Sequence, residues 1–156
     1  MTKELPKAYD FKSTEPRIYA MWEAGGFFKP HNDPNNANFD PNVKPFVISI
    51  PPPNVTGELH IGHAMFVSVE DLMIRYHRMK GYSTLWVPGT DHAGIATQLM
   101  VEKDLLKNEE VTREELGRDE FVKRTWEWKK KYGNIITTQI RRLGASCDWD
   151  RERFTL

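Results

Sequence analysis

The pattern of apolar side chains along the chain predicts two strands. The segment from Phe46 to Ile50 is almost uninterrupted in its apolar character, and Ser83 to Val87 is a second segment of similar length. Short runs of this kind are typical of strands that are covered on both faces of a parallel sheet. We therefore expect the first strand to lie at the centre of such a sheet.

Longer amphipathic segments predict the helices. Ser13-Thr-Glu-Pro16 indicates a helix start, and Gly25-Gly26 the end of that helix. A second helix is expected from about His63 to Gly81, with a buried stripe made of Phe66, Val69, Leu72, Met73, Tyr76 and Met79.

Two more helices follow the second strand. One is expected from about Ile95 to Lys107, and another from Asp119 to Leu143 after a capping box at Thr112–Glu115. The expected buried stripe of the last helix is Phe121, Trp128, Tyr132, Ile135, Ile136 and Ile140.

The order strand, helix, strand, helix predicts an α/β fold, the first half of a Rossmann-type domain with a parallel sheet flanked by helices. We expect residues 1–44 to form a helix and loop extension, because 31–44 is rich in Asn, Asp and Pro and has no periodicity. Residues 45–156 are expected to form the first half of a nucleotide-binding catalytic domain.

Composition narrows the class of protein. The 156 residues carry 22 basic and 22 acidic side chains, so the formal charge is zero and shows no electrostatic footprint for nucleic acid. The single Cys147 excludes an internal disulfide and predicts a small buried side chain. No signal-peptide pattern and no apolar run near the roughly 20 residues of a bilayer span is present, so we expect a cytoplasmic protein without a membrane partner.

The candidate chemistry lies between the first strand and the second helix, in Pro51-Pro-Pro-Asn-Val-Thr-Gly-Glu-Leu-His-Ile-Gly-His63. His60 and His63 are one helical turn apart where a strand leads into a helix N-terminus. Backbone N–H groups and the helix dipole attract phosphate at such a place. The segment therefore favours an ATP triphosphate over a metal ion, and it offers no Cys or carboxylate at metal-ligand spacing.

Three segments carry a resemblance to a known family. His60-Ile-Gly-His63 after Asn-Val-Thr-Gly resembles the first signature of the class I aminoacyl-tRNA synthetases, and its flanks resemble the valyl branch. Val87-Pro-Gly-Thr-Asp-His-Ala-Gly-Ile-Ala-Thr-Gln98 is a second match. Trp126-Glu-Trp-Lys and Arg141-Arg-Leu-Gly-Ala-Ser-Cys-Asp-Trp149 form the third.

The resemblance implies activation of valine with ATP and Mg²⁺, then transfer of the valyl group to tRNA(Val). His60 and His63 would donate hydrogen bonds to phosphate oxygens in the transition state. The expected ATP-binding residues are Thr56, Gly57, His60, Gly62 and His63. In this interpretation Gly62 leaves room for the nucleotide, Thr56 adds a hydroxyl, and Gly57 permits unusual turn dihedrals.

The valine site needs a carboxylate for the substrate ammonium, and Asp91 fits this role by position and charge. By resemblance, Pro52 and Asn54 also line that site. A plain alternative for Asp91 is N-capping of the following helix, and the two roles are compatible. His92 is left open between a site residue and a packed or capping histidine.

The family's lysine-rich second signature does not occur in this sequence. The resemblance therefore implies an N-terminal piece of a longer enzyme, which needs the second half of its catalytic domain. Two other functions stay open at this point. One is a stand-alone nucleotidyltransferase with a His-x-Gly-His signature, and the other is a non-catalytic module that binds ATP or an adenylate.

Overall fold

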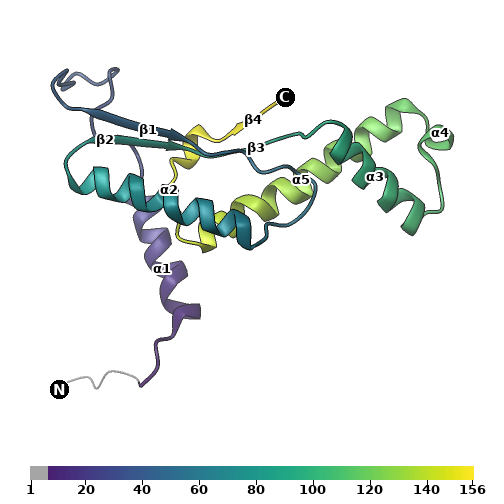
Figure 1. Ribbon diagram of the computed structural model, residues 1–156, viewed down its shortest axis with the longest axis horizontal. Coiled ribbons are helices and arrows are strands. Elements are labelled where there is room, and N and C mark those ends of the chain that lie inside the picture. The colour runs from purple at the N-terminus through teal and green to yellow at the C-terminus, as the bar shows by residue number, and fades with distance from the viewer. Residues whose placement is uncertain (1–6) are drawn as a thin grey trace.

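The computed structural model describes residues 7–156. The helices are α1 (Phe11–Ala24), α2 (Ile61–Met79), α3 (Ile95–Asn108), α4 (Arg113–Leu116) and α5 (Arg118–Arg142), with a 3₁₀ turn η1 (Trp149–Arg151). The strands are β1 (Pro45–Ser49), β2 (Ser83–Val87), β3 (Gly89–Thr90) and β4 (Arg153–Phe154). Figure 1 shows them along one elongated body, with α3 and α4 at the end opposite the loop before β1.

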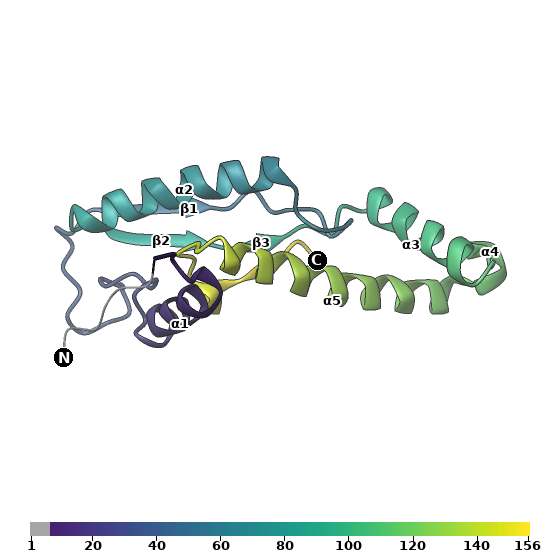
Figure 2. The same ribbon diagram turned by 90° about the horizontal axis from the view of Figure 1, so that it is seen from below.

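The sheet is parallel, as predicted. β1 pairs with β2 in a register that places Pro45 opposite Ser83 and Ser49 opposite Val87. Figure 2 shows α2 and α5 running roughly along the long axis of the molecule, and Ile74 of α2 packs in one core with Trp86 of β2 and Ile136 of α5. The α/β class with parallel strands flanked by helices is therefore confirmed.

The expected central position of β1 is not met by the described residues. Within 7–156, β1 pairs with β2 alone, and its residues alternate between exposed and half-buried. Val47 is 58% exposed. An apolar strand can be buried on both faces only where other elements pack against both faces. The elements described for 7–156 pack against one face of β1 and leave Pro45, Val47 and Ser49 exposed.

Helix α2 faces the sheet with a different side from the predicted one. Its buried apolar residues are Val67 and Ile74, whereas most of the expected stripe is exposed: Val69, Leu72, Met73, Tyr76 and Met79. Only Phe66 of that stripe packs against the core. The prediction of the buried stripe was therefore wrong for this helix.

Polar contacts explain the orientation of α2. Glu70 accepts a hydrogen bond from the indole Nε1 of the buried Trp86 at 3.0 Å. Asp71 accepts from the backbone N–H of Ser146 at 2.9 Å and from its hydroxyl at 2.6 Å. Arg78 donates to Thr84 and Ser146, both at 3.1 Å. Because buried polar groups require partners, these contacts oppose rotation of the apolar stripe towards the sheet.

Helix α5 connects two hydrophobic cores, and its predicted stripe is confirmed except for Ile135, which is half-buried and belongs to neither core. Ile136 and Ile140 join the core that contains Trp86. Phe121 and Trp128 join a second core with α3. The half-buried Tyr132 packs against both. The capping box of Thr112 and Glu115 is present, at the start of α4.

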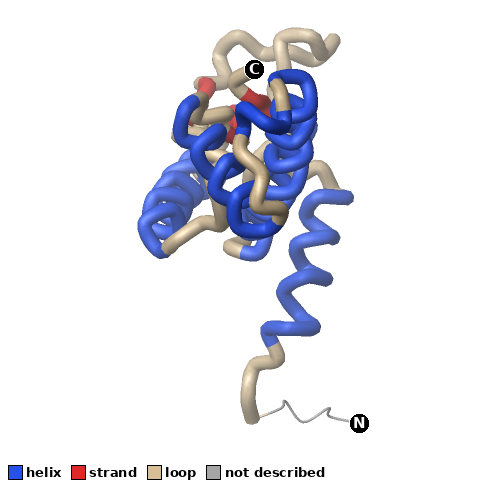
Figure 3. Tube along the Cα trace, turned by 90° about the vertical axis from the view of Figure 1, so that its right-hand side faces the viewer, coloured by secondary structure: helices blue, strands red, loops and turns tan. Residues whose placement is uncertain are grey.

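Helix α1 is held mainly through aromatic side chains. The Tyr19 hydroxyl donates to the Ala145 carbonyl at 2.7 Å and accepts from the Trp149 indole at 2.8 Å. Figure 3 shows that the N-terminal end of α1 extends away from the other helices. The helix starts two residues earlier than predicted, because Asp10 caps it. The division of the chain at residue 44 stays a prediction.

Two separate expectations concern Cys147 and membrane-spanning helices. Cys147 is fully buried, as expected, and burial raises the pKa of its thiol above the ordinary value. No helix within 7–156 combines the length and apolar character required to cross a bilayer.

The orientation of α2 gives a direct prediction. Ile74→Ala should lower the free energy of unfolding by about 2–5 kcal/mol, since Ile74 is fully buried. Leu72→Ala should change it by less than about 0.5 kcal/mol, since Leu72 is 67% exposed. Urea unfolding of both variants measures the difference, and a larger loss for Leu72→Ala would contradict this orientation.

Candidate functional site

The site is built where β1 and β2 end. The Ile50 N–H still donates to the Val87 carbonyl at 3.0 Å. Pro51, Pro52 and Pro53 have no N–H groups, so this strand cannot continue to donate across the sheet.

Pairing resumes beyond the prolines and joins two loops, the first loop (residues 51–60, between β1 and α2) and the second loop (residues 91–94, between β3 and α3). The Asp91 N–H donates to the Pro53 carbonyl at 2.8 Å, and the Val55 N–H donates to the Asp91 carbonyl at 2.9 Å. These bonds form an isolated parallel bridge between Asn54 and Asp91. Two predicted site residues, 37 positions apart in sequence (91 minus 54), are thereby held side by side.

Helix α5 supports the first loop through two side chains whose role in the site was not predicted. The Trp128 indole donates to the carbonyl of the fully buried Val55 at 2.8 Å. The Gln139 side-chain oxygen accepts from the Leu59 N–H at 2.9 Å. Trp128 was recognised as a buried helix position, but no sequence pattern specified its bond to the loop.

His60 and His63 form a reciprocal cap at the start of α2, two residues earlier than the predicted helix start. His60 Nδ1 accepts from the Gly62 N–H at 3.1 Å, and His63 Nδ1 accepts from the His60 N–H at 3.2 Å. Their ring centroids are 4.0 Å apart. Since an accepting nitrogen carries no proton, each neutral ring is protonated at Nε2, which leaves two N–H donors available to a ligand.

The pKa of His63 is lowered from its ordinary value, first by burial and second by the neighbouring His60. The neutral form of His63 is therefore favoured at neutral pH. This pair is suited to hydrogen-bond donation to phosphate oxygens, and the N-terminus of α2 adds positive electrostatic potential at the same place.

The surroundings of Gly57 and Gly62 differ. A Cβ at position 62 would lie 2.9 Å from His60 Cε1, so Gly62 makes space for the His60 ring of this same chain. Gly57 has an ordinary backbone conformation, and a Cβ there would meet nothing within 4 Å. The expectation that Gly57 provides unusual turn dihedrals was wrong.

The unusual backbone lies instead in the second loop. Ala93 has φ +53° and Gly94 has φ +43°. Gly94 occupies the N-cap position of α3, and no side chain bonds to that cap. The alternative that Asp91 caps this helix is therefore wrong.

Asp91 is held by a residue that the sequence did not reveal. Its Oδ1 accepts from the Thr155 hydroxyl at 2.6 Å and lies 3.3 Å from His92 Nδ1. The Thr155 bond is the main cause that lowers the pKa of Asp91, and backbone N–H groups and His92 contribute. The carboxylate is therefore ionised at neutral pH and remains partly exposed.

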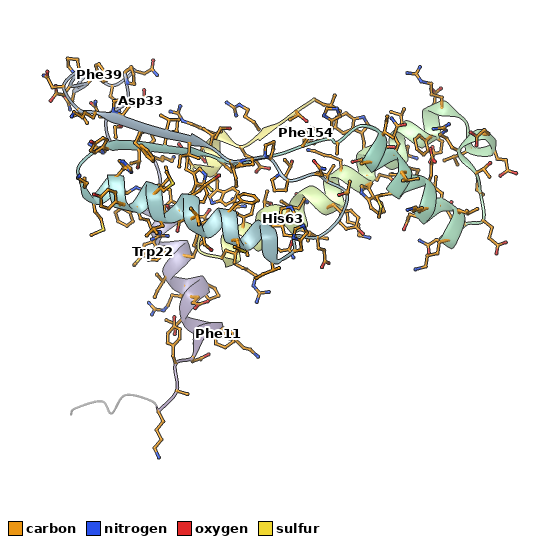
Figure 4. All side chains as sticks on the ribbon, in the orientation of Figure 1. Phe11, Trp22, Asp33, Phe39, His63 and Phe154 are labelled. Carbon is orange, nitrogen blue, oxygen red and sulfur yellow. The ribbon has the colours of Figure 1, made fainter. Side chains whose placement is uncertain are left out.

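The remaining predicted residues lie along the first loop. Pro52 and Asn54 are exposed, and Thr56 is half-buried. A cavity of about 520 Å³ adjoins the loops, with Val55, His92, Trp126 and Phe154 among its lining residues. Figure 4 labels His63 and Phe154, which both lie near the middle of the long axis, beyond the ends of β1 and β2.

Comparison with known proteins gives a match that covers most of the chain. The model of the "tRNA synthetases class I (I, L, M and V)" matches residues 17–156. The chain belongs to this family.

Curated relatives within the family are valine–tRNA ligases, which confirms the valyl resemblance. The chloroplastic/mitochondrial valine–tRNA ligase 2 of Arabidopsis thaliana is 64% identical over 98% of this chain and 15% of that protein. The valine–tRNA ligase of Caulobacter vibrioides is 57% identical over 97% and 16%. The chain thus spans about one sixth of the length of these relatives.

A solved structure shares the fold. The agnB2 LeuRS of Agrobacterium radiobacter K84, in its ternary complex with tRNA and LeuAMS, matches 95% of this chain and 16% of its own. The TM-score is 0.74 at 22% sequence identity. The comparison therefore confirms the class I synthetase fold for this segment.

The bond from Trp128 to the first loop gives a prediction for stability. Trp128→Phe keeps an aromatic ring but leaves the buried Val55 carbonyl without its donor, which should cost about 1–3 kcal/mol in urea unfolding. Trp126→Phe is the matched control, because Trp126 is 51% exposed and should change stability by less than about 0.5 kcal/mol. Equal losses in the two variants would contradict the anchoring role.

The contact of Gly62 with His60 gives a second prediction. Gly62→Ala should displace the His60 ring, since the added Cβ would overlap it. In proton NMR, the ring signals of His60 and His63 should shift because the close contact between the two rings is lost. Gly57→Ala adds the same methyl group in open space and should leave them unchanged. Unaltered histidine signals in Gly62→Ala would contradict the cap geometry.

Proposed function

We propose that this chain supplies the adenylate-forming part of a valine–tRNA ligase. In that reaction the carboxylate of valine attacks the α-phosphate of ATP, pyrophosphate leaves, and valyl-adenylate forms. The valyl group then passes to a ribose hydroxyl at the 3′ end of tRNA(Val). The observation that carries the proposal is the backbone bridge between Asn54 and Asp91, which joins a carboxylate loop to the loop that leads into the His60–His63 pair.

The histidine pair acts on the phosphate side of the reaction. Negative charge is redistributed over the α-phosphate oxygens as the new P–O bond forms and the bond to pyrophosphate breaks. The Nε2–H groups of His60 and His63 donate to these oxygens, and positioning with charge stabilisation accounts for the catalysis. Neither ring needs to take up or release a proton in this step.

The carboxylate loop acts on the amino-acid side. The ionised Asp91 pairs with the ammonium group of valine. Pro52 and Asn54 line the valine site from the opposite loop, beside the backbone bridge. Thr56 and Gly57 contribute to the ATP site with Gly62. The substrate is thus oriented by complementary groups, because its ammonium end meets the carboxylate of the second loop and its phosphate end meets the donors of the histidine pair.

ATP enters with Mg²⁺ held by its own phosphates. Magnesium prefers oxygen ligands, whereas the pair at the start of α2 offers imidazole rings whose Nδ1 atoms already accept from backbone N–H groups. Within the described residues there is no group of three His, Cys, Asp or Glu side chains that could hold a metal ion. Magnesium neutralises phosphate charge when bound, and the histidines orient the α-phosphate.

Calorimetric titration with a non-hydrolysable valyl-adenylate analogue tests the proposal. The chain should bind it more tightly than the isoleucyl analogue, and His60→Ala with His63→Ala should abolish binding because both donors are lost. His31→Ala is the matched control, since His31 is exposed in the loop before β1. Circular dichroism confirms that each variant is folded.

Each possible outcome has a clear meaning. Selective binding that survives only in the control supports an adenylate site carried by this chain. Binding of ATP without preference for valine would favour a nucleotide-binding module. No binding by a well-folded chain would contradict the proposal that these loops form the site by themselves.

A further inference from the structure

Thr155 is the centre of a hydrogen-bonded cluster that it forms with Asp91 and His92 of the second loop. Its Oγ1 lies 2.6 Å from Asp91 Oδ1, 3.0 Å from the His92 backbone nitrogen and 2.5 Å from His92 Nδ1. One hydroxyl therefore contacts the predicted ammonium-binding carboxylate and the histidine that follows it. Thr155 lies 64 residues from Asp91 in the sequence.

The chain delivers Thr155 to this place through a second parallel pairing. β4 pairs with β3, with Gly89 opposite Arg153 and Thr90 opposite Phe154. The Arg153 N–H donates to the Pro88 carbonyl at 3.0 Å. A Cβ on Gly89 would lie 2.8 Å from the Arg153 carbonyl oxygen, so the close approach of the two strands requires glycine there.

The number of protons available in the cluster determines which ring nitrogen of His92 is protonated. A hydroxyl has one proton to donate and two lone pairs that accept. Asp91 is an ionised acceptor, so the Thr155 proton goes to its Oδ1. The backbone N–H of His92 donates to one lone pair of Oγ1. The contact from Nδ1 then requires a proton on Nδ1, which leaves Nε2 of the neutral ring unprotonated.

We propose that Thr155 is a positioning residue that orients the Asp91 carboxylate and holds His92 in the Nδ1–H tautomer, so that His92 Nε2 is a hydrogen-bond acceptor in the site. His92 lines the 520 Å³ cavity next to the loops. Among their carboxylate and imidazole groups, the second loop then presents acceptors, Asp91 and His92 Nε2. The first loop presents donors, the Nε2–H groups of His60 and His63.

This opposition explains how the two loops discriminate the ends of a substrate. The acceptor loop suits an ammonium or hydroxyl donor, and the donor loop suits phosphate or carboxylate oxygens. The substrate assignment rests on the proposed function. The tautomer and the orientation of Asp91 do not, since they follow from contacts within the chain.

Nitrogen-15 NMR of the histidine rings tests the inference on the chain itself. The spectra are recorded at about pH 8.5, two units above an ordinary histidine pKa of about 6.5, and the two nitrogens of a neutral ring report which one carries the proton. Wild-type His92 should be protonated at Nδ1, while His60 and His63 should be protonated at Nε2. His92→Gln assigns the His92 signals among the five histidines.

Three threonine variants separate the hydroxyl from mere packing. Thr155→Val keeps the shape but removes the hydroxyl, and should release His92 to a mixture or to the Nε2–H form. Thr155→Ser keeps the hydroxyl and should preserve the Nδ1–H form. Thr138→Val, at an exposed position on α5, is the matched control and should change nothing. An Nε2–H form of His92 in the wild type, or an unchanged tautomer in Thr155→Val, would overturn the inference.

Calorimetry with the valyl-adenylate analogue adds a readout of the proposed function. Thr155→Val should weaken binding about tenfold, which corresponds to one lost orienting hydrogen bond, and Thr155→Ser should restore it. If the wild type binds no analogue but shows the expected tautomers, the proposed function fails while the inference about Thr155 stands. Full-strength binding by Thr155→Val would overturn the positioning role.

Discussion

The backbone bonds between Pro53, Val55 and Asp91 are the constraint on which the site depends. Pro51, Pro52 and Pro53 interrupt the donation from the first strand, so the chain leaves the sheet after Ile50. A few residues later, the backbone bonds to Asp91 fix the chain again. The two loops are therefore separate from the strands and yet fixed to each other. Without this second pairing, the carboxylate and the histidine pair would belong to independent loops.

The same constraint explains the position of α5. The first loop is bonded to the second loop on one side, and its Val55 carbonyl needs a donor on the other side. Trp128 supplies that donor from the middle of α5, and Gln139 holds Leu59 just before His60. The long helix thus sets the distance between the two cores and supports the site loop at two points. Its apolar stripe could be recognised from spacing, because α5 buries the side that the 3.6-residue period predicts.

Sequence reasoning identified the elements better than their surroundings. The two strands β1 and β2, the helices α3 and α5, and the neighbouring positions of His60 and His63 follow from local patterns. The buried side of α2 does not, because Glu70, Asp71 and Arg78 find partners on other elements and override the apolar stripe. Thr155 could not be found, since its contacts depend on a pairing between residues far apart in sequence. Unusual turn dihedrals were expected at Gly57, whereas in the site loops the positive φ values occur at Ala93 and Gly94.

The protonation pattern of the site has a consequence for catalysis. A pair of imidazolium ions at a helix N-terminus would bind phosphate strongly before any reaction, and uniform binding of substrate and transition state gives no acceleration of the chemical step. The lowered pKa of His63 favours the neutral form of that ring. Rings in the neutral form, which bonds to the backbone fix as Nε2–H donors, interact more weakly with the ground state, and their bonds strengthen as charge develops. Their orientation is set before the substrate arrives. In the proposed reaction, the reciprocal cap of His60 and His63 therefore serves stability and chemistry with the same two hydrogen bonds.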